Sequence, residues 1–420
     1  MSKYRFTTCI FLLVAWLATF ACTEKTDKLD GANSHYSDLV MLFQEFREFQ
    51  KPKTTEGAPD YTTSSVQTQY EGLKEYQNRL ASIDPNSWSV SERIDYHLVR
   101  AEMNGLEFQH RVLKPWAVDP GFYADLISRQ LRIRGLPLAS EDIAGVEQNL
   151  RSVPGIVKQA KENLSSLSEI SGDLATLAIL DLEGGLGSFD KRAANLKQHH
   201  PELASAVDSA KEAMTDYLNW IKSNQSKMTA PAGVGKENYN WLLKNVYLFP
   251  YTWEEVRTIV ELEDNRVITF QRLEENRNRH LPKLKPAQSQ AEYKQSVREA
   301  ISHIMNFLKV EEIFTMHDYL VPGDYFGSWH GFEDPWPEKH DYFFNFSHRE
   351  PVMEETHEMV GHHFDELRSE RHPHPIRGGR RPYKIATARH EGFAFALEEL
   401  LMHAGYLDGR SQRAREIVYE

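Results

Sequence analysis

Residues 356–366, THEMVGHHFDE, contain a His-Glu pair followed closely by two further histidines. Zinc hydrolases commonly place two histidines at positions i and i+4 of one helix, with a glutamate after the first that acts as general base. Here position i+4 is Gly361, and the next histidines stand one and two places later, at His362 and His363. The residue types indicate zinc chemistry, whereas their spacing departs from the usual pattern.

A local change in helix geometry would reconcile this spacing with a metal site. On a straight helix, His357 and His362 point about 140° apart, because each residue turns the helix by about 100°. One inserted residue absorbed as a π-bulge would bring both imidazoles to one face, and such bulges are frequent at functional sites. Gly361 is the position where the backbone best tolerates distortion. His363 lies about 120° from His357 on the other side and is the poorer, alternative ligand.

A second helix could supply a third ligand. Residues 389–405, RHEGFAFALEELLMHAG, have a strongly helical pattern that opens on His390 and Glu391. Zinc peptidases that take a ligand from a second helix use a glutamate, so Glu391 is the candidate. Gly392 would allow the two helices to pack closely. Glu398 and Glu399 could accept hydrogen bonds from the ligand imidazoles, although we expect surface charge to be the role of at least one.

The motifs together resemble a known family. HE..GHH, then EG-aromatic-A, then an acidic helix ending in Gly-Tyr, is similar to the bacterial domain-of-unknown-function family number 885. The resemblance runs along the whole chain and is specific at residues 341–408, although the family's motif, HEA-x-PGHH, is one residue longer. HEMVGH is also similar to the H-E-x-x-G-H of dipeptidyl peptidase III, where a zinc helix accommodates one extra residue. The family resemblance implies a largely helical, peptidase-like protein with a zincin-type, gluzincin-like site.

Resemblance and geometry together predict the roles of individual residues. His357, His362 and Glu391 would hold Zn²⁺, and Glu358 would take a proton from the bound water and pass it to the leaving amine. The predicted substrate is a short peptide. Four residues of the basic stretch 371–384 could bind a substrate carboxylate or an oxyanion, although a solvated loop and simple packing remain alternatives: Arg377, Arg380, Arg381 and Tyr383.

Other functions remain open. A zinc amidase or esterase would use the same activated water. A non-catalytic, surface-anchored binding protein with a degenerate site would explain the offset motif. The histidines could also form a polar helix surface, because this part of the chain is rich in histidine.

The N-terminus predicts export. Residues 1–21 combine Lys3 and Arg5 with an apolar run, as a signal peptide does. Cleavage before Cys22 resembles a lipoprotein box, which predicts a lipid-anchored protein of the bacterial cell envelope with a tether at residues 22–35. Only two cysteines are present, so the mature chain cannot form a disulfide within itself. The net charge of −12 argues against nucleic acid and against an anionic membrane surface as partners, leaving the lipid as the membrane contact.

The remaining pattern predicts a mainly α protein, with an N-terminal helical region at 36–235 and a C-terminal metallohydrolase-like region at 236–420. Residues 183–187, rich in glycine, are predicted to form a turn, and DYFFNFS at 341–347 a strand that either lies in a core or pairs with an extended peptide. The last residues resemble a helix interior, so we expect the chain to be truncated at its end. Periodic apolar residues predict helices at 36–50, 66–83, 91–113, 141–164, 176–228, 253–277, 291–314 and 389–405.

Overall fold

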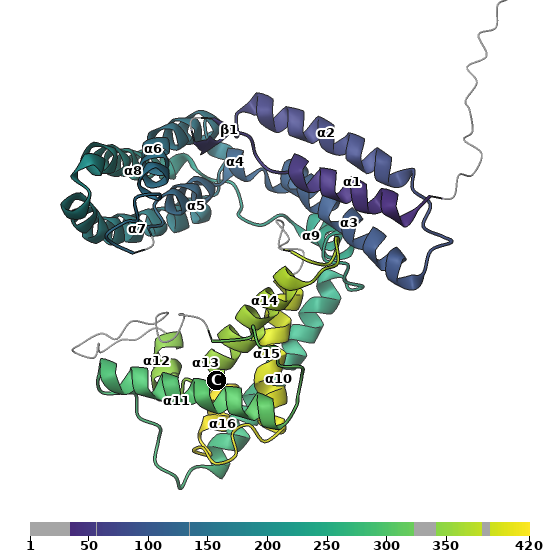
Figure 1. The fold of residues 1–420 in the computed structure, drawn as a ribbon, viewed down its shortest axis with the longest axis vertical. Coiled ribbons are helices and arrows are strands. Elements are labelled where there is room, and N and C mark those ends of the chain that lie inside the picture. The colour runs from purple at the N-terminus through teal and green to yellow at the C-terminus, as the bar shows by residue number, and fades with distance from the viewer. Residues whose placement is uncertain (1–33, 56, 134, 323–341, 380–386) are drawn as a thin grey trace, which may run out of the picture.

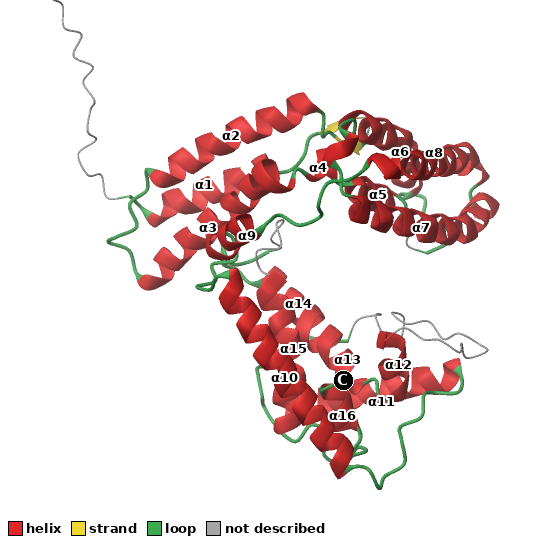
Figure 2. Ribbon diagram, turned by 180° about the vertical axis from the view of Figure 1, so that it is seen from behind, coloured by secondary structure: helices red, strands yellow, loops and turns green. Residues whose placement is uncertain are grey.

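The computed structural model describes residues 34–55, 57–133, 135–322, 342–379 and 387–420. Over these residues the chain is mainly α-helical (Figure 1), as the sequence predicts. The strands formed there are a short antiparallel pair, β1 (Thr54–Thr55) and β2 (Ala58–Pro59), drawn yellow in Figure 2. No helix of this described part is both long and apolar enough to cross a bilayer. The predicted signal peptide and Cys22 lie outside the described residues.

Three long helices near the N-terminus enclose a core of their own, called the first core below. They are α1 (Tyr36–Phe49), α2 (Thr63–Ala81) and α3 (Val90–Phe108), and a π-helical turn at Gln109–Leu113 follows α3. A capping box begins α3: the Ser89 hydroxyl accepts a hydrogen bond from Glu92 N–H, and the Glu92 carboxylate accepts one from Ser89 N–H. The three helices match segments predicted from their apolar spacing.

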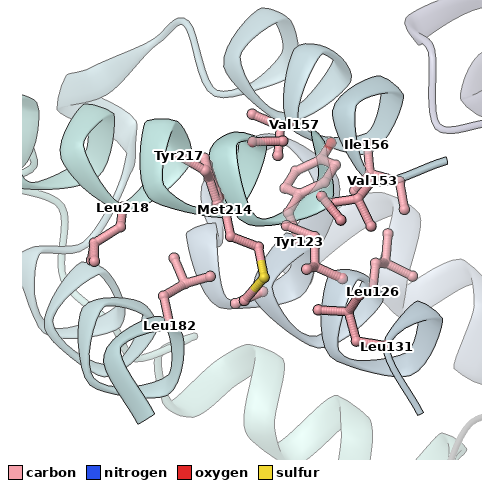
Figure 3. Packing of buried hydrophobic residues seen from close by; sticks show 14 of the residues in the cluster. Tyr123, Leu126, Leu131, Val153, Ile156, Val157, Leu182, Met214, Tyr217 and Leu218 are labelled. Carbon is pink, nitrogen blue, oxygen red and sulfur yellow. The ribbon is translucent and has the colours of Figure 1, made fainter. Parts of the chain in front are cut away.

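A second core lies among the helices that follow (Figure 3). Its largest fully buried side chains include Tyr123 and Tyr217, and the phenol of Tyr217 donates a hydrogen bond to the Pro120 carbonyl. The elements of this part are α4 (Pro115–Val118), α5 (Pro120–Gln130), α6 (Ile143–Asn163), α7 (Gly172–His199), α8 (Ala204–Asn224) and the 3₁₀ turns Leu167–Glu169, Pro201–Leu203 and Gln225–Lys227.

The predicted turn at residues 183–187 is wrong, because α7 continues through the glycines without a break. Leu182 and Phe189 stand on either side of the glycines, seven residues apart, and both are buried in the second core. Seven residues are close to two helical turns, so both side chains reach the same neighbours only if the stretch between them is helical. Packing therefore outweighs the low helix propensity of glycine.

The C-terminal helices surround a third core. Helix α10 begins with the predicted capping box, in which Thr252 accepts from Glu255 N–H. Figure 1 shows α9 beside the start of α10, between the N-terminal and the C-terminal helices. The elements are α9 (Lys236–Asn245), α10 (Trp253–Arg277), α11 (Gln290–Val310), α12 (Tyr342–Arg349), α13 (Val352–Glu355), the π-helix η5 (Thr356–His363), α14 (Phe364–Arg371), α15 (Thr387–His403) and α16 (Ala414–Val418).

The predicted strand at 341–347 is also wrong, because its described residues belong to helix α12. Ser347 and His348 are buried against Tyr293 of α11. The Ser347 hydroxyl lies 3.0 Å from the Tyr293 phenol oxygen, and the His348 ring stacks on the Tyr293 ring with centroids 3.8 Å apart. Contacts with α11 thus override the β-propensity of an aromatic run. Residues 342–349 consequently offer no strand that could pair with an extended peptide.

The loop at residues 372–379, between α14 and α15, is fixed to the first core. Ile376 is fully buried there among side chains of the N-terminal helices. Arg377 Nε donates to Asp95 of α3 at 2.7 Å, and the Tyr36 phenol donates to the same carboxylate at 2.9 Å. The Asp95 side chain is only 1% exposed. The described part of the connection after α14 is therefore held by the N-terminal part of the chain.

We expect Arg377→Ala to lower the free energy of unfolding by about 1–3 kcal/mol, because a buried carboxylate loses its charged partner. The matched control is Arg272→Ala, which removes an ion pair whose side chains are 71% and 39% exposed. Its cost should stay below about 1 kcal/mol. Urea denaturation of both variants measures the difference. Equal costs would mean that the Asp95 contact does not fix the loop.

Candidate metal centre

The histidine motif lies in a π-helix, as the spacing predicts. Residues Thr356–His363 form η5, and Phe364 N–H, at its end, donates to the Met359 carbonyl five residues earlier. This i→i+5 bonding brings residues five apart onto one face. The rings of His357 and His362 accordingly meet edge to face, with centroids 4.7 Å apart. The inserted residue is thus absorbed within the helix.

The π-helix η5 and helix α15 lie very close together at Gly361. A Cβ added there would lie 2.5 Å from Ala394 Cβ and 2.7 Å from Ala394 Cα. Such distances are well below van der Waals contact, so only glycine fits. At Gly392, nothing lies within 4 Å of an added Cβ. The prediction that Gly392 permits the close packing is wrong, because the residue faces away from η5; Gly361 provides that contact.

Glu391, near the start of α15, faces both imidazoles. Its Oε2 lies 3.7 Å from His357 Nε2 and 3.5 Å from His362 Nε2. The donor atoms of a tetrahedral zinc site lie about 3.3 Å apart, because each bond is about 2.0–2.1 Å long. The observed separations are close to this value. The Glu391 side chain is 49% exposed, which leaves the site accessible from solvent.

Glu358 is also close to the two histidines. Single ligand atoms of His357, Glu358 and His362 all lie within 4.8 Å of one another. The donor set is therefore two imidazoles with two carboxylates around them. One oxygen of Glu391 lies at nearly equal distance from the Nε2 atoms of His357 and His362. Glu358 follows His357 on the same element, η5.

A carboxylate orients one of the two candidate ligand histidines. His357 Nδ1 lies 2.7 Å from Glu398 Oε1, so the ring donates its Nδ1 proton and turns Nε2 toward Glu391. Burial acts to lower the pKa of His357, but the hydrogen bond and charge of Glu398 and the charges of Glu358 and Glu391 raise the pKa above its usual value. This hydrogen bond agrees with the expectation that Glu398 could orient the imidazole of a candidate ligand.

His362 has the opposite electrostatic environment. Burial lowers its pKa, and the nearby His390 and His357 lower it further. A neutral imidazole, the form that binds metal, is therefore favoured at His362. Its Nδ1 is buried and has no hydrogen-bond partner among the described residues.

A protonated carboxyl adjoins the site. Burial raises the pKa of Glu355 to about 8, and the charges of Glu354 and Glu358 add to the rise. Glu355 is consequently mostly neutral at pH 7, which limits the repulsion between carboxylates on this turn.

Glu399 has a structural role. Its carboxylate accepts from Arg266 of α10 at 2.6 and 2.8 Å and from the Tyr419 hydroxyl at 3.2 Å. It faces α10 and not the histidines. The two adjacent glutamates therefore have different contacts: Glu398 is bonded to His357, and Glu399 joins α15 to its neighbours.

The other predicted residues have different surroundings or lie outside the described residues. His363 is half-buried beside Phe364, and its role as an alternative ligand stays a prediction. Arg377 is engaged with Asp95, so a role in substrate binding stays a prediction. Arg380, Arg381 and Tyr383 lie outside the described residues.

Sequence reasoning assigned no role to His390 or Phe395. The ring of His390 stacks on His362 with centroids 4.0 Å apart. The ring of Phe395 meets His357 edge to face at 4.9 Å. Helical spacing from Glu391 could have identified Phe395, because residues four apart share a helix face.

Comparison with known proteins assigns the chain to a family. The profile described as "Bacterial protein of unknown function (DUF885)" matches residues 50–312, so the chain belongs to this family. The match covers the helical body and ends before the histidine motif, although the resemblance was expected to be specific at residues 341–408. No curated protein matches.

One solved structure has a similar fold. It is described as "a putative lipoprotein of unknown function from Shewanella oneidensis", with a TM-score of 0.59 and 16% sequence identity. The similarity covers 92% of this chain and 80% of that chain. At this identity the likeness concerns the fold.

We expect Gly361→Ala to destabilise the C-terminal helices by about 1–3 kcal/mol, because the new methyl group collides with Ala394 and its backbone. Gly392→Ala is the matched control, with open space for its methyl group. It should be neutral or stabilise the protein by up to about 1 kcal/mol, since alanine favours helix. Urea denaturation distinguishes the two. A harmless Gly361→Ala would contradict the close contact.

Proposed function

We propose that this protein is a zinc-dependent hydrolase that cleaves short peptides. The observation that supports this most strongly is the convergence of His357 Nε2 and His362 Nε2 on one oxygen of Glu391. Two imidazoles and a carboxylate are the ligands of many catalytic zinc sites, in which a fourth position is left for water. The half-exposed Glu391 side chain is compatible with access for water and substrate.

Each residue has a distinct part in this proposal. His357, His362 and Glu391 hold the metal, and Glu398 keeps His357 in the tautomer that presents Nε2. Zinc at this place would acidify a bound water and polarise the scissile carbonyl. Glu358 accepts the proton of that water and later donates it to the leaving amine. His362, held neutral by its surroundings, needs to lose no proton to bind metal.

The proposed location is the bacterial cell envelope. A signal peptide at 1–21 and lipidation at Cys22 follow from the sequence, and the solved structure with a similar fold is described as a lipoprotein. In this proposal the membrane contact is the lipid alone. The acidic net charge of −12 gives no reason to expect a nucleic-acid partner.

Metal content tests the site directly. Mass spectrometry of the purified protein should find about one zinc per chain, and Glu391→Gln should lose most of it because one of three ligands is weakened. Glu358→Gln should keep the zinc and lose turnover by about 100-fold or more, since the general base is gone. Well-folded wild-type protein without zinc would overturn the proposal. Peptide, amide and ester panels would then separate a peptidase from an amidase or esterase.

The hydrogen bond between His357 and Glu398 provides a second test of the proposed zinc site. We expect Glu398→Gln to weaken zinc binding by about 10–100-fold, because His357 loses the acceptor that orients it. Glu399→Gln, at the next position, is the control, since Glu399 faces Arg266. Competition with a zinc chelator measures both affinities. If Glu399→Gln weakens zinc binding as much as Glu398→Gln does, the assigned role of Glu398 is wrong.

A further inference from the structure

One large apolar side chain beside the metal ligands is turned to solvent. Phe395 is 64% exposed, although its ring lies 4.9 Å from the ring of His357. The neighbouring α15 residues are buried, Ala394 beside Gly361 of η5 and Leu397 in the third core. The buried face of α15 therefore contains Ala394 and Leu397, and Phe395 lies outside that face.

The position of Phe395 on α15 places it between two residues of the site. Glu391 precedes it by four residues and Glu398 follows it by three, so all three share one face of the helix. All three contact His357: Glu391 lies near its Nε2, Glu398 accepts a hydrogen bond from its Nδ1, and the Phe395 ring meets its ring edge to face. An exposed phenyl ring thus adjoins the place where the proposed chemistry occurs.

We propose that Phe395 binds an apolar side chain of the peptide next to the bond that is cleaved. This inference rests on the proposed hydrolase function and adds a substrate class to it, namely peptides with an aromatic or large aliphatic residue at the cleavage site. Covering the ring removes apolar surface from water, which favours such a side chain over a small one. Because the ring lies beside a metal ligand, the bound side chain lies beside the reacting carbonyl.

A purely structural role explains less of the geometry. His357 is already oriented by Glu398 at 2.7 Å, and Phe395 touches it edge to face. A residue placed only to support His357 would have its ring largely covered by that contact, whereas most of this ring remains exposed. The two roles also differ in outcome: loss of support weakens zinc binding, and loss of a substrate contact does not.

Leu400 provides a matched control on the same helix. It is 52% exposed, and it stands five residues after Phe395, about 140° around α15. It follows Glu399, whose carboxylate faces Arg266 of α10. Leu400→Ala therefore removes a comparable exposed apolar side chain from another face of α15.

The test measures binding to zinc-loaded Glu358→Gln protein, which retains peptides without cleaving them. The probes are fluorescently labelled alanine tetrapeptides with one phenylalanine at each position in turn, beside tetra-alanine. For the phenylalanine peptide that binds most tightly, Phe395→Ala should weaken binding about 10-fold. Phe395→Ala should leave the affinity for tetra-alanine and the zinc content unchanged. Leu400→Ala should leave the binding of all these peptides unchanged. Phe395→Leu should restore most of the preference.

The possible failures can be told apart. Equal losses for all peptides, no loss at all, or a fall in zinc content in Phe395→Ala would overturn the substrate contact and leave the hydrolase proposal intact. Absence of zinc from the wild-type protein would overturn the hydrolase proposal, and this inference with it. In the wild-type background, kcat/KM for the same peptides should show the same preference.

Discussion

The candidate centre depends on how one extra residue between two histidines is accommodated. An α-helical turn would direct His357 and His362 to different faces, and the π-helix η5 brings their rings within 4.7 Å. A π-helical turn is wider and less favourable than an α-helical one, so neighbouring structure must stabilise it. Helix α15 packs directly against the widened turn, with Ala394 beside Gly361.

Helix α15 supplies the other half of the arrangement through simple periodicity. Glu391, Phe395 and Glu398 lie on one helix face and all meet His357, while Ala394, slightly turned from them, lies close to Gly361. One helix therefore brings together a candidate ligand, a hydrogen-bond acceptor for His357 and an apolar surface. These candidate site residues stand on helices and not on loops.

The sequence predicts those parts that depend on local pattern. Apolar spacing and the Thr252 capping box predict helices that the structure contains. The spacing of five residues between His357 and His362 predicts the π-helix. The errors occur where distant packing decides. The aromatic run at 341–347 is helical because Tyr293 covers Ser347 and His348, and the glycines of α7 stay helical because flanking residues are buried. Gly361 could not be distinguished from Gly392, since only the arrangement of the two helices decides which glycine meets a neighbour.

The family match and the candidate site lie in different parts of the chain, and the structure connects them. The matched residues 50–312 include two of the three helices of the first core, α2 and α3. That core holds Ile376 and, through Asp95, Arg377 from the loop between α14 and α15. Residues 95 and 377 are 282 positions apart, so no local pattern announces this contact. Residues 372–379 directly follow α14, the helix after the histidines, so the contact ties this end of α14 to the first core. The N-terminal helical body and the helices that carry the candidate site are thereby in direct contact.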